Sequence, residues 1–184
     1  MACGIDLRCT HVPRAIRLVF VGRKHKESSE VFEKRVIAGW GDMDFNSHMR
    51  NTAFLDKSAD VRMMFFAENG FPMDEFIRRK IGPVIMRDEV EYFREIRLLE
   101  ELRVTLAMAG LAPDGTRFVI RNEFWRVDAK MAARVTSAGG WLDLTARKLV
   151  APPGALLATL RSLARTDDFQ VLASSIRNVA ADSR

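Results

Sequence analysis

The pattern of apolar and polar positions predicts one strand, a polar junction and a long helix in the first part of the chain. Residues 31–40 (VFEKRVIAGW) alternate as a half-buried strand does, with Lys34 as the exception. Residues 51–69 carry apolar side chains at spacings of one, three and four, and Gly70 follows as a helix-ending glycine. The apolar positions extend beyond one stripe, so we expect this helix to be surrounded on most sides.

The second half of the chain predicts a meander of strands. After a short helical segment around 73–79 the apolar period changes to two, and residues 84–98 form one long predicted strand with a bulge near Asp88. A Pro-Asp-Gly turn at 113–115 and a Gly-Gly pair at 139–140 mark a hairpin and a close backbone approach. Further strands are predicted over 101–111, 117–127 and 132–143, and a C-terminal helix over 154–164. The order β–α–β–β–β–β–α indicates the α+β class, with an antiparallel sheet wrapped around a long central apolar helix.

Length and charge divide the chain into one domain and two flanking segments. A chain of 184 residues is most simply one domain. Residues 1–30 hold six Lys and Arg residues against three acidic ones, so they contribute +3 of the net charge of +5. We predict a basic, poorly structured N-terminal extension over 1–30. It is native sequence, a transit peptide or the result of a start codon assigned too early. A domain over 31–165 and a polar C-terminal tail over 166–184 follow.

The composition excludes several classes of function. Outside the N-terminal extension the charges nearly balance, so no nucleic-acid surface is predicted. A mildly basic domain suits a small phosphate-bearing ligand such as coenzyme A. No apolar run approaches the length of a membrane span. Cys3 and Cys9 both lie in the extension, so we expect no disulfide framework, and a reducing cytoplasm is the expected compartment.

Polar side chains crowd the junction before the predicted helix. Asp44, Asn46 and His48 alternate, and in an extended segment all three would face one side. The carboxylate could act as a base or nucleophile, while the amide and the imidazole position substrate or move a proton. The alternative is structural: Asp44 or Asn46 caps the helix and His48 is a solvated residue.

Glu95 is the second candidate carboxylate. It lies in the predicted strand 84–98, within the run YFREI, where a lone glutamate among other charges is usually solvated. No metal site is predicted, because His48 is the only histidine outside the N-terminal extension and no paired-histidine motif occurs.

Three runs of sequence resemble one known superfamily. Residues 44–54 (DFNSHMRNTAF), which lead into an apolar helix, resemble the start of hotdog-fold acyl thioesterases. Within that superfamily they are similar to the 4-hydroxybenzoyl-CoA thioesterase-like and acyl-carrier-protein thioesterase groups. Residues 92–95 (YFRE) resemble their Tyr-Arg-Arg-Glu strand, which supplies a catalytic glutamate. Residues 141–153 are similar to the last strand and its exit into a helix. The chain departs from the family pattern at Met49 and Arg50, where valine or alanine and then asparagine are usual.

The resemblance implies a hotdog fold and a catalytic site for thioester hydrolysis. By it, Asp44 would attack the thioester or activate water, Asn46 and His48 would position substrate or water, and Glu95 could assist as base. Which carboxylate is the nucleophile stays open. The thioester carbonyl would point at backbone N–H groups in an oxyanion-type arrangement. These N–H groups belong to Met49, Arg50, Asn51 and Thr52.

The resemblance also implies partners. Two subunits would pair their sheets edge to edge, giving a homodimer or a dimer of dimers with the site at the interface. The substrate would be an acyl-CoA or an acyl-carrier protein, with no cofactor other than coenzyme A as part of the substrate. Basic side chains would bind its phosphates. The candidates are Arg121, Arg126, Arg134, Arg147 and Lys148.

Two other functions remain as alternatives to an acyl-CoA thioesterase. The first is a hotdog-fold hydratase or dehydratase acting on enoyl thioesters. Those enzymes carry four residues between the aspartate and the histidine and a proline before the histidine, whereas here three residues separate Asp44 from His48 and no proline occurs. The second is a non-catalytic acyl-binding protein.

Overall fold

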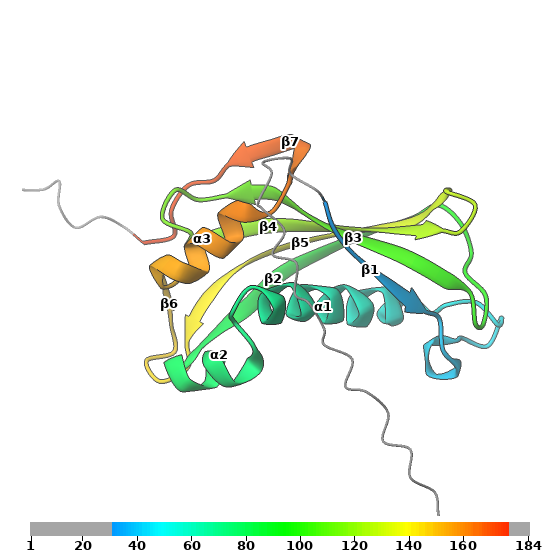
Figure 1. Ribbon diagram of the computed structural model, residues 1–184, viewed down its shortest axis with the longest axis horizontal. Helices are drawn as coiled ribbons and strands as arrows, with labels where there is room; N and C mark the ends of the chain where they lie inside the picture. Colours follow the sequence, from blue (N-terminus) through cyan, green and yellow to red (C-terminus); the bar gives the residue numbers. More distant parts are fainter. Residues whose placement is uncertain (1–30, 177–184) are drawn as a thin grey trace, which may run out of the picture.

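A curved antiparallel sheet lies against one side of a long helix in the computed structural model, which describes residues 31–176 (Figure 1). The predicted N-terminal extension and the last residues of the predicted C-terminal tail lie outside this range. The elements follow in the order β1 (Phe32–Ile37), η1 (Trp40–Asp42), α1 (Asn51–Glu68), α2 (Met73–Arg79), β2 (Ile81–Tyr92), β3 (Glu101–Leu111), β4 (Arg117–Arg126), β5 (Met131–Asp143), β6 (Lys148–Val150), α3 (Gly154–Ser162) and β7 (Arg165–Val171). None of the helices within this range is long and apolar enough to cross a membrane.

The sheet has the strand order β1-β3-β4-β5-β2. All neighbours on this path are antiparallel, β6 adds to β5, and β7 runs parallel to β3. The predicted bulge is confirmed, because the register of β2 against β5 shifts between Ile85 and Arg87. Within residues 31–176, β2 pairs with β5 alone, so its other edge is free.

Helix α1 is the central helix predicted from the sequence, and it ends as predicted. Asn69 caps it, and Gly70 follows with a φ of 84°, a left-handed conformation that suits glycine. Phe54 and Phe66 are among its buried residues and pack edge-on against Phe124 and Trp141 of the sheet. The expectation that the helix is covered on most sides is wrong for the single chain, since its opposite face is exposed. That face includes Asp56, Asp60 and Met64.

Close packing of the sheet explains the paired glycines of β5. A Cβ atom on Gly139 would lie 2.5 Å from the Val84 carbonyl oxygen and 2.8 Å from Phe118 Cζ. Real Cβ atoms do not approach this closely, so β2 and the Phe118 ring can sit against β5 only where it has no side chain. The predicted close approach at this pair is confirmed.

Strand β2 ends earlier than predicted, and this changes the position of Glu95. The strand stops at Tyr92 rather than at residue 98, because the N–H groups of Phe93 and Arg94 both donate to the Ala132 carbonyl and the chain then leaves the sheet. Residues 93–100 form a loop, so the placement of Glu95 in a strand is wrong.

The sheet also extends beyond the predicted domain end at 165. Strand β1 pairs with β3 only as far as Leu106, which leaves the rest of that edge open. Strand β7 occupies it, with Gln170 and Val171 opposite Gly110 and Leu111 (Figure 1). The first part of the predicted tail is therefore a strand.

Candidate active site

Asp42 holds the loop between β1 and α1 against the helix. Its carboxylate accepts a hydrogen bond from the Gly39 N–H at 2.7 Å and lies 2.8 Å from Lys57 Nζ of α1. Its carbonyl accepts the Arg50 N–H at 2.8 Å. Burial acts to raise the pKa of Asp42, but the contacts with Lys57 and the Gly39 N–H outweigh it, so the pKa lies below its ordinary value of 3.8. Asp42 thus fixes where the loop meets the first turn of α1.

Asp44 closes a tight turn within the same loop. Its Oδ1 accepts the N–H groups of Asn46 at 2.7 Å and His48 at 3.1 Å, and its own N–H donates to the His48 carbonyl at 2.8 Å. Ser47, inside the turn, has a φ of 61°. The expectation that this segment is extended with three side chains on one side is wrong, because aspartate side chains readily bond to nearby backbone N–H groups.

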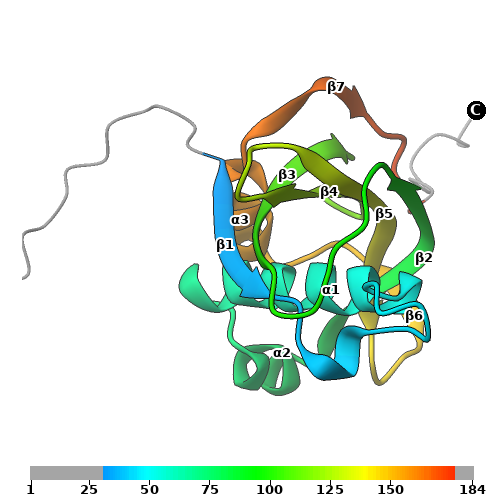
Figure 2. The same cartoon turned by 90° about the vertical axis from the view of Figure 1, so that its right-hand side faces the viewer.

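The turn directs His48 toward Glu95. His48 Nε2 lies 3.2 Å from Glu95 Oε2. Two backbone contacts join the loops that carry His48 and Glu95. One is a β-bridge between His48 and Arg97, and in the other the Met49 N–H donates to the Ile96 carbonyl at 2.8 Å. Figure 2 faces the end of the molecule where the two loops lie side by side. The structure therefore brings together two predicted catalytic residues that come from separate loops of the chain.

A cavity of about 290 Å³ opens beside this pair. Its walls are mostly apolar, and Glu95 and His48 lie at its edge with the buried side chain of Met49. The side chains of Asp44 and Asn46 do not line it. The remaining lining residues, none of which was predicted as a site residue, are Phe54, Tyr92, Phe93, Arg94 and Ile96.

The first turn of α1 borders the same region. The N-cap residue Arg50 makes no side-chain capping hydrogen bond. The N–H groups of Met49 and Arg50 already donate to backbone carbonyls, so in this conformation they are not free to bind a carbonyl as predicted. The Thr52 N–H bonds only to the exposed Asn51 side chain, at 2.9 Å. Of the four predicted N–H groups, those of Asn51 and Thr52 make no bond to a backbone carbonyl within residues 31–176, and they lie at the helix end where the dipole favours negative charge.

Three arginines lie next to the His48–Glu95 pair. A second cavity, of about 570 Å³, shares Phe93, Arg94 and Glu95 with the first and is also lined by Arg97 and Arg126. Arg126 bonds to Glu100, and Arg94 donates to the Met131 carbonyl at 2.7 Å. Arg94 and Arg97 were not predicted, because only the loop after β2 brings them to this end of the molecule.

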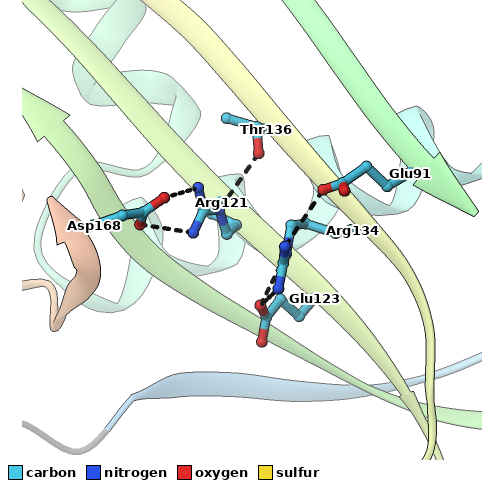
Figure 3. Close-up of polar contacts among 6 residues, drawn as sticks. All are labelled: Glu91, Arg121, Glu123, Arg134, Thr136 and Asp168. Atoms are coloured by element: carbon cyan, nitrogen blue, oxygen red, sulfur yellow. Dashed lines mark hydrogen bonds and ion pairs between the residues drawn. The ribbon is translucent and has the colours of Figure 1, made fainter.

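The other predicted basic residues lie elsewhere. Arg121 is on the outer face of the sheet, where it makes two 2.8 Å hydrogen bonds to Asp168 of β7 (Figure 3). Its pKa is raised above the ordinary value, chiefly by this contact. Arg134 contacts Glu91 and Glu123 on the same face.

Arg147 and Lys148 are also remote from the His48–Glu95 pair. They lie at β6, toward the opposite end of the sheet from the loop that precedes α1 (Figure 1). Within residues 31–176, no group of three or more His, Cys, Asp or Glu side chains could hold a metal ion.

The fold has clear counterparts among solved structures. A hypothetical protein from Staphylococcus aureus, solved in complex with CoA, has a TM-score of 0.68 at 16% identity, covering 78% of this chain and 92% of that one. A 1,4-dihydroxy-2-naphthoyl-CoA thioesterase from Synechocystis has a TM-score of 0.65 at 15% identity, covering 72% and 96%. A putative oleoyl thioesterase from Lactobacillus plantarum has a TM-score of 0.68 at 13% identity, covering 86% of this chain and 59% of that one.

At these identities the likeness shows a shared fold, the hotdog fold expected from the sequence. No curated protein matches the chain in sequence. A family model described as the thioesterase-like superfamily does match, over residues 38–160, which is more than half of the chain. Helix α1, the two loops at its N-terminus and strands β2 to β6 lie in that range, and the chain belongs to the thioesterase-like superfamily.

Proposed function

We propose that this protein is an acyl-CoA thioesterase in which Glu95 is the catalytic carboxylate and His48 positions it. The observation that carries the proposal is the 3.2 Å contact between the two side chains at the edge of a mostly apolar cavity beside the N-terminus of α1. A site of this kind offers what thioester hydrolysis needs: an apolar space for an acyl group, a carboxylate, and helix N–H groups for a developing oxyanion.

The reaction can be followed atom by atom. The thioester carbonyl oxygen accepts hydrogen bonds from the N–H groups of Asn51 and Thr52. Glu95 removes a proton from a water molecule, and the resulting hydroxide adds to the carbonyl carbon. The carbon–sulfur bond then breaks, the acyl group becomes a carboxylic acid, and the thiolate leaves as the thiol after taking the proton that Glu95 removed from water. His48 holds Glu95 through Nε2 in the orientation that accepts the proton.

Asp44 has a different role in this proposal from the one first expected. Its carboxylate oxygen already accepts two backbone N–H groups of its own turn, and its side chain does not line the cavity. It therefore shapes the loop that presents His48.

The carrier is coenzyme A, and we assign its phosphates to the arginine group beside the site. Arg94, Arg97 and Arg126 line the cavity adjoining the His48–Glu95 pair, whereas Arg121 is held by Asp168 on the outer face. Arginine binds phosphate oxygens through charge-assisted hydrogen bonds. The CoA complex of the Staphylococcus aureus structure supports this carrier.

A homodimer completes the proposed enzyme. Strand β2 is twelve residues long, and its free edge exposes backbone groups that pair readily with another strand. Met86 and Tyr92 of this strand are about half exposed, which suits burial against a second copy.

The test compares Glu95→Gln with wild type on a panel of acyl-CoA thioesters, measuring thiol release. We expect kcat to fall by about 10²- to 10⁴-fold, the usual contribution of a general base. Glu89→Gln is the matched control, because Glu89 is exposed on β2 and bound only to its neighbour Arg87. Full activity in Glu95→Gln refutes the assignment. Hydration of enoyl-CoA without hydrolysis would instead identify a hydratase, and binding without turnover an acyl-binding protein.

The phosphate assignment has its own test. Arg97→Ala should raise KM for acyl-CoA but not for the same acyl group on N-acetylcysteamine, which has no phosphate. An equal rise in KM for both substrates would contradict a phosphate contact.

A further inference from the structure

A second apolar cavity lies between α1 and the sheet, farther along the helix from the His48–Glu95 pair. Its volume is about 160 Å³, and it shares no lining residue with the cavity beside that pair. Its apolar walls include Met63, Phe66, Pro83, Ile85, Phe118 and Ile120. One charged side chain, Arg62 of α1, also lines it.

The guanidinium group of Arg62 includes one unbonded nitrogen in the part of the chain that the structure describes. Its Nη1 atom is buried and makes no hydrogen bond within residues 31–176. Burial lowers the pKa of Arg62, and the negative charge of Asp88 on β2 acts on it in the opposite direction. One helical turn earlier, the Ser58 hydroxyl is also buried and unbonded within this range. Buried donors are nearly always bonded, because leaving one unbonded costs about 1–3 kcal/mol.

The charges of Arg62, which lines the cavity, and of Asp88 together favour one kind of chemical group. The carboxylate of Asp88 is held on the cavity side of the sheet by a hydrogen bond from Ser137. Because one positive and one negative charge already balance, a ligand carboxylate would add an unpaired charge. A hydroxyl can accept a hydrogen bond from the guanidinium and donate one to the carboxylate at the same time.

The distance from the reacting end of the substrate limits what can carry this hydroxyl. Arg62 follows Thr52 by ten residues, which is about 15 Å along the helix axis. Leu55 and Ala59 are half-buried on the intervening turns of α1. A single aromatic ring attached to the carbonyl would end well before Arg62, whereas an aliphatic chain lying along this flank would reach it.

We propose that the acyl group is an aliphatic chain with a hydroxyl on its distal part, and that Arg62 and Asp88 bind this hydroxyl. The inference rests on the proposed thioesterase function for the position of the carbonyl. The hydroxyl accepts a hydrogen bond from Arg62 and donates one to Asp88, and the apolar walls of the cavity contact the methylene groups.

The experiment measures kcat/KM for decanoyl-CoA, for the same thioester with a terminal hydroxyl, and for sebacoyl-CoA, which ends in a carboxylate. Shorter chains of each type extend the panel. Wild type should prefer the hydroxylated chain over the plain chain by about tenfold or more, as expected when a hydrogen bond to a charged group is lost. In Arg62→Met, which keeps the apolar stem, the preference should fall to about onefold. Asp88→Asn should reduce it as well, and Arg87→Met, an exposed neighbour on β2, should keep it.

Several results would overturn the inference. One is an equal preference of wild type and Arg62→Met for the hydroxylated chain over the plain chain. Another is a preference of wild type for sebacoyl-CoA over the hydroxylated chain. The last is that hydrolysis of hydroxybenzoyl-CoA depends on Arg62. The last result would place the guanidinium beside the reacting carbonyl instead of at the distal end of the chain.

A binding measurement separates this inference from the proposed function. Calorimetry with free hydroxydecanoic and decanoic acids uses full-length protein and needs no turnover. Tighter binding of the hydroxy acid that is lost in Arg62→Met supports the inference even if no thioester is hydrolysed. Turnover of acyl-CoA with no such difference in binding or in kcat/KM leaves the thioesterase proposal standing and refutes the hydroxyl site.

Discussion

Substituting Asp44 in two ways separates a chemical role for its carboxylate from a structural one. Asn keeps an oxygen that can accept the N–H groups of Asn46 and His48, but it has no charge and cannot act as base or nucleophile. Ala removes the acceptor altogether. If the carboxylate serves the turn, Asp44→Asn should stay close to wild type and Asp44→Ala should not.

The size of the effect follows from the two hydrogen bonds at 2.7 and 3.1 Å. Removing a side-chain acceptor that bonds to exposed backbone N–H groups at a helix N-cap costs about 1 kcal/mol, and this turn is comparable. In a chain of this size that loss lowers Tm by about 2–4 °C. We expect Asp44→Ala to lose about tenfold in kcat/KM, because His48 is no longer held toward Glu95, and Asp44→Asn to keep activity within about threefold.

Thermal unfolding and thiol release, measured on the same preparations, provide the assay. Glu95→Gln serves as the reference for loss of a reacting carboxylate without loss of the turn. The reasoning is refuted if Asp44→Asn has the Tm of wild type yet loses activity as completely as Glu95→Gln. That outcome would return Asp44 to the role of base or nucleophile that its sequence motif first suggested.

Two further substitutions test the packing and electrostatics that position the site. Gly139→Ala should destabilise the fold by about 1–3 kcal/mol, because the new Cβ atom meets Val84 and Phe118 at distances that can be relieved only by moving strands. The measurement is the urea midpoint of unfolding, which should fall. An unchanged midpoint contradicts the close approach. Asp42 has a pKa below 3.8 in the folded state, so it adds stability above that pH, and this contribution is lost as the pH falls through the lowered value. In Asp42→Asn, the free energy of unfolding should therefore fall less steeply as the pH is lowered below about 4. The same dependence on pH in wild type and in the variant would exclude a contribution from the Lys57 contact.

Local patterns were sufficient to predict most of the fold. Helix α1 was predicted because apolar residues recur at spacings of one, three and four before Gly70, and the φ of 84° at Gly70 favours glycine. The hairpin between β3 and β4 was predicted from the Pro-Asp-Gly sequence at 113–115, and Gly115 has a positive φ, of 73°, at this turn. These features depend on residues adjacent in sequence, for which local propensity and turn chemistry are informative.

Features that depend on contacts distant in sequence were predicted incorrectly or not at all. The run from Tyr92 to Leu98 has the composition of a strand, and only the acceptance of two N–H groups by Ala132 and the bridge to His48 show that the chain leaves the sheet. Strand β7 depends on the edge of β3 that β1 leaves uncovered. Arg121 was predicted to bind phosphate. Its guanidinium instead bonds to Asp168, which lies in a segment predicted to be a tail.

The spacing within the Asp-x-Asn-x-His run has a physical explanation that differs from the one first given for it. In an extended segment, alternation places the three side chains on one side, as in a strand. In the folded chain the same spacing serves the backbone, because Oδ1 of Asp44 accepts the N–H groups two and four residues ahead. The Met49 N–H then bonds to Ile96, which carries the preceding histidine to the glutamate. Inserting one residue between Asp44 and His48 would keep every side chain of the motif but separate these N–H groups from their acceptor. The residues of this motif are therefore not only candidate reactive groups, because their spacing also forms the turn that brings His48 to Glu95.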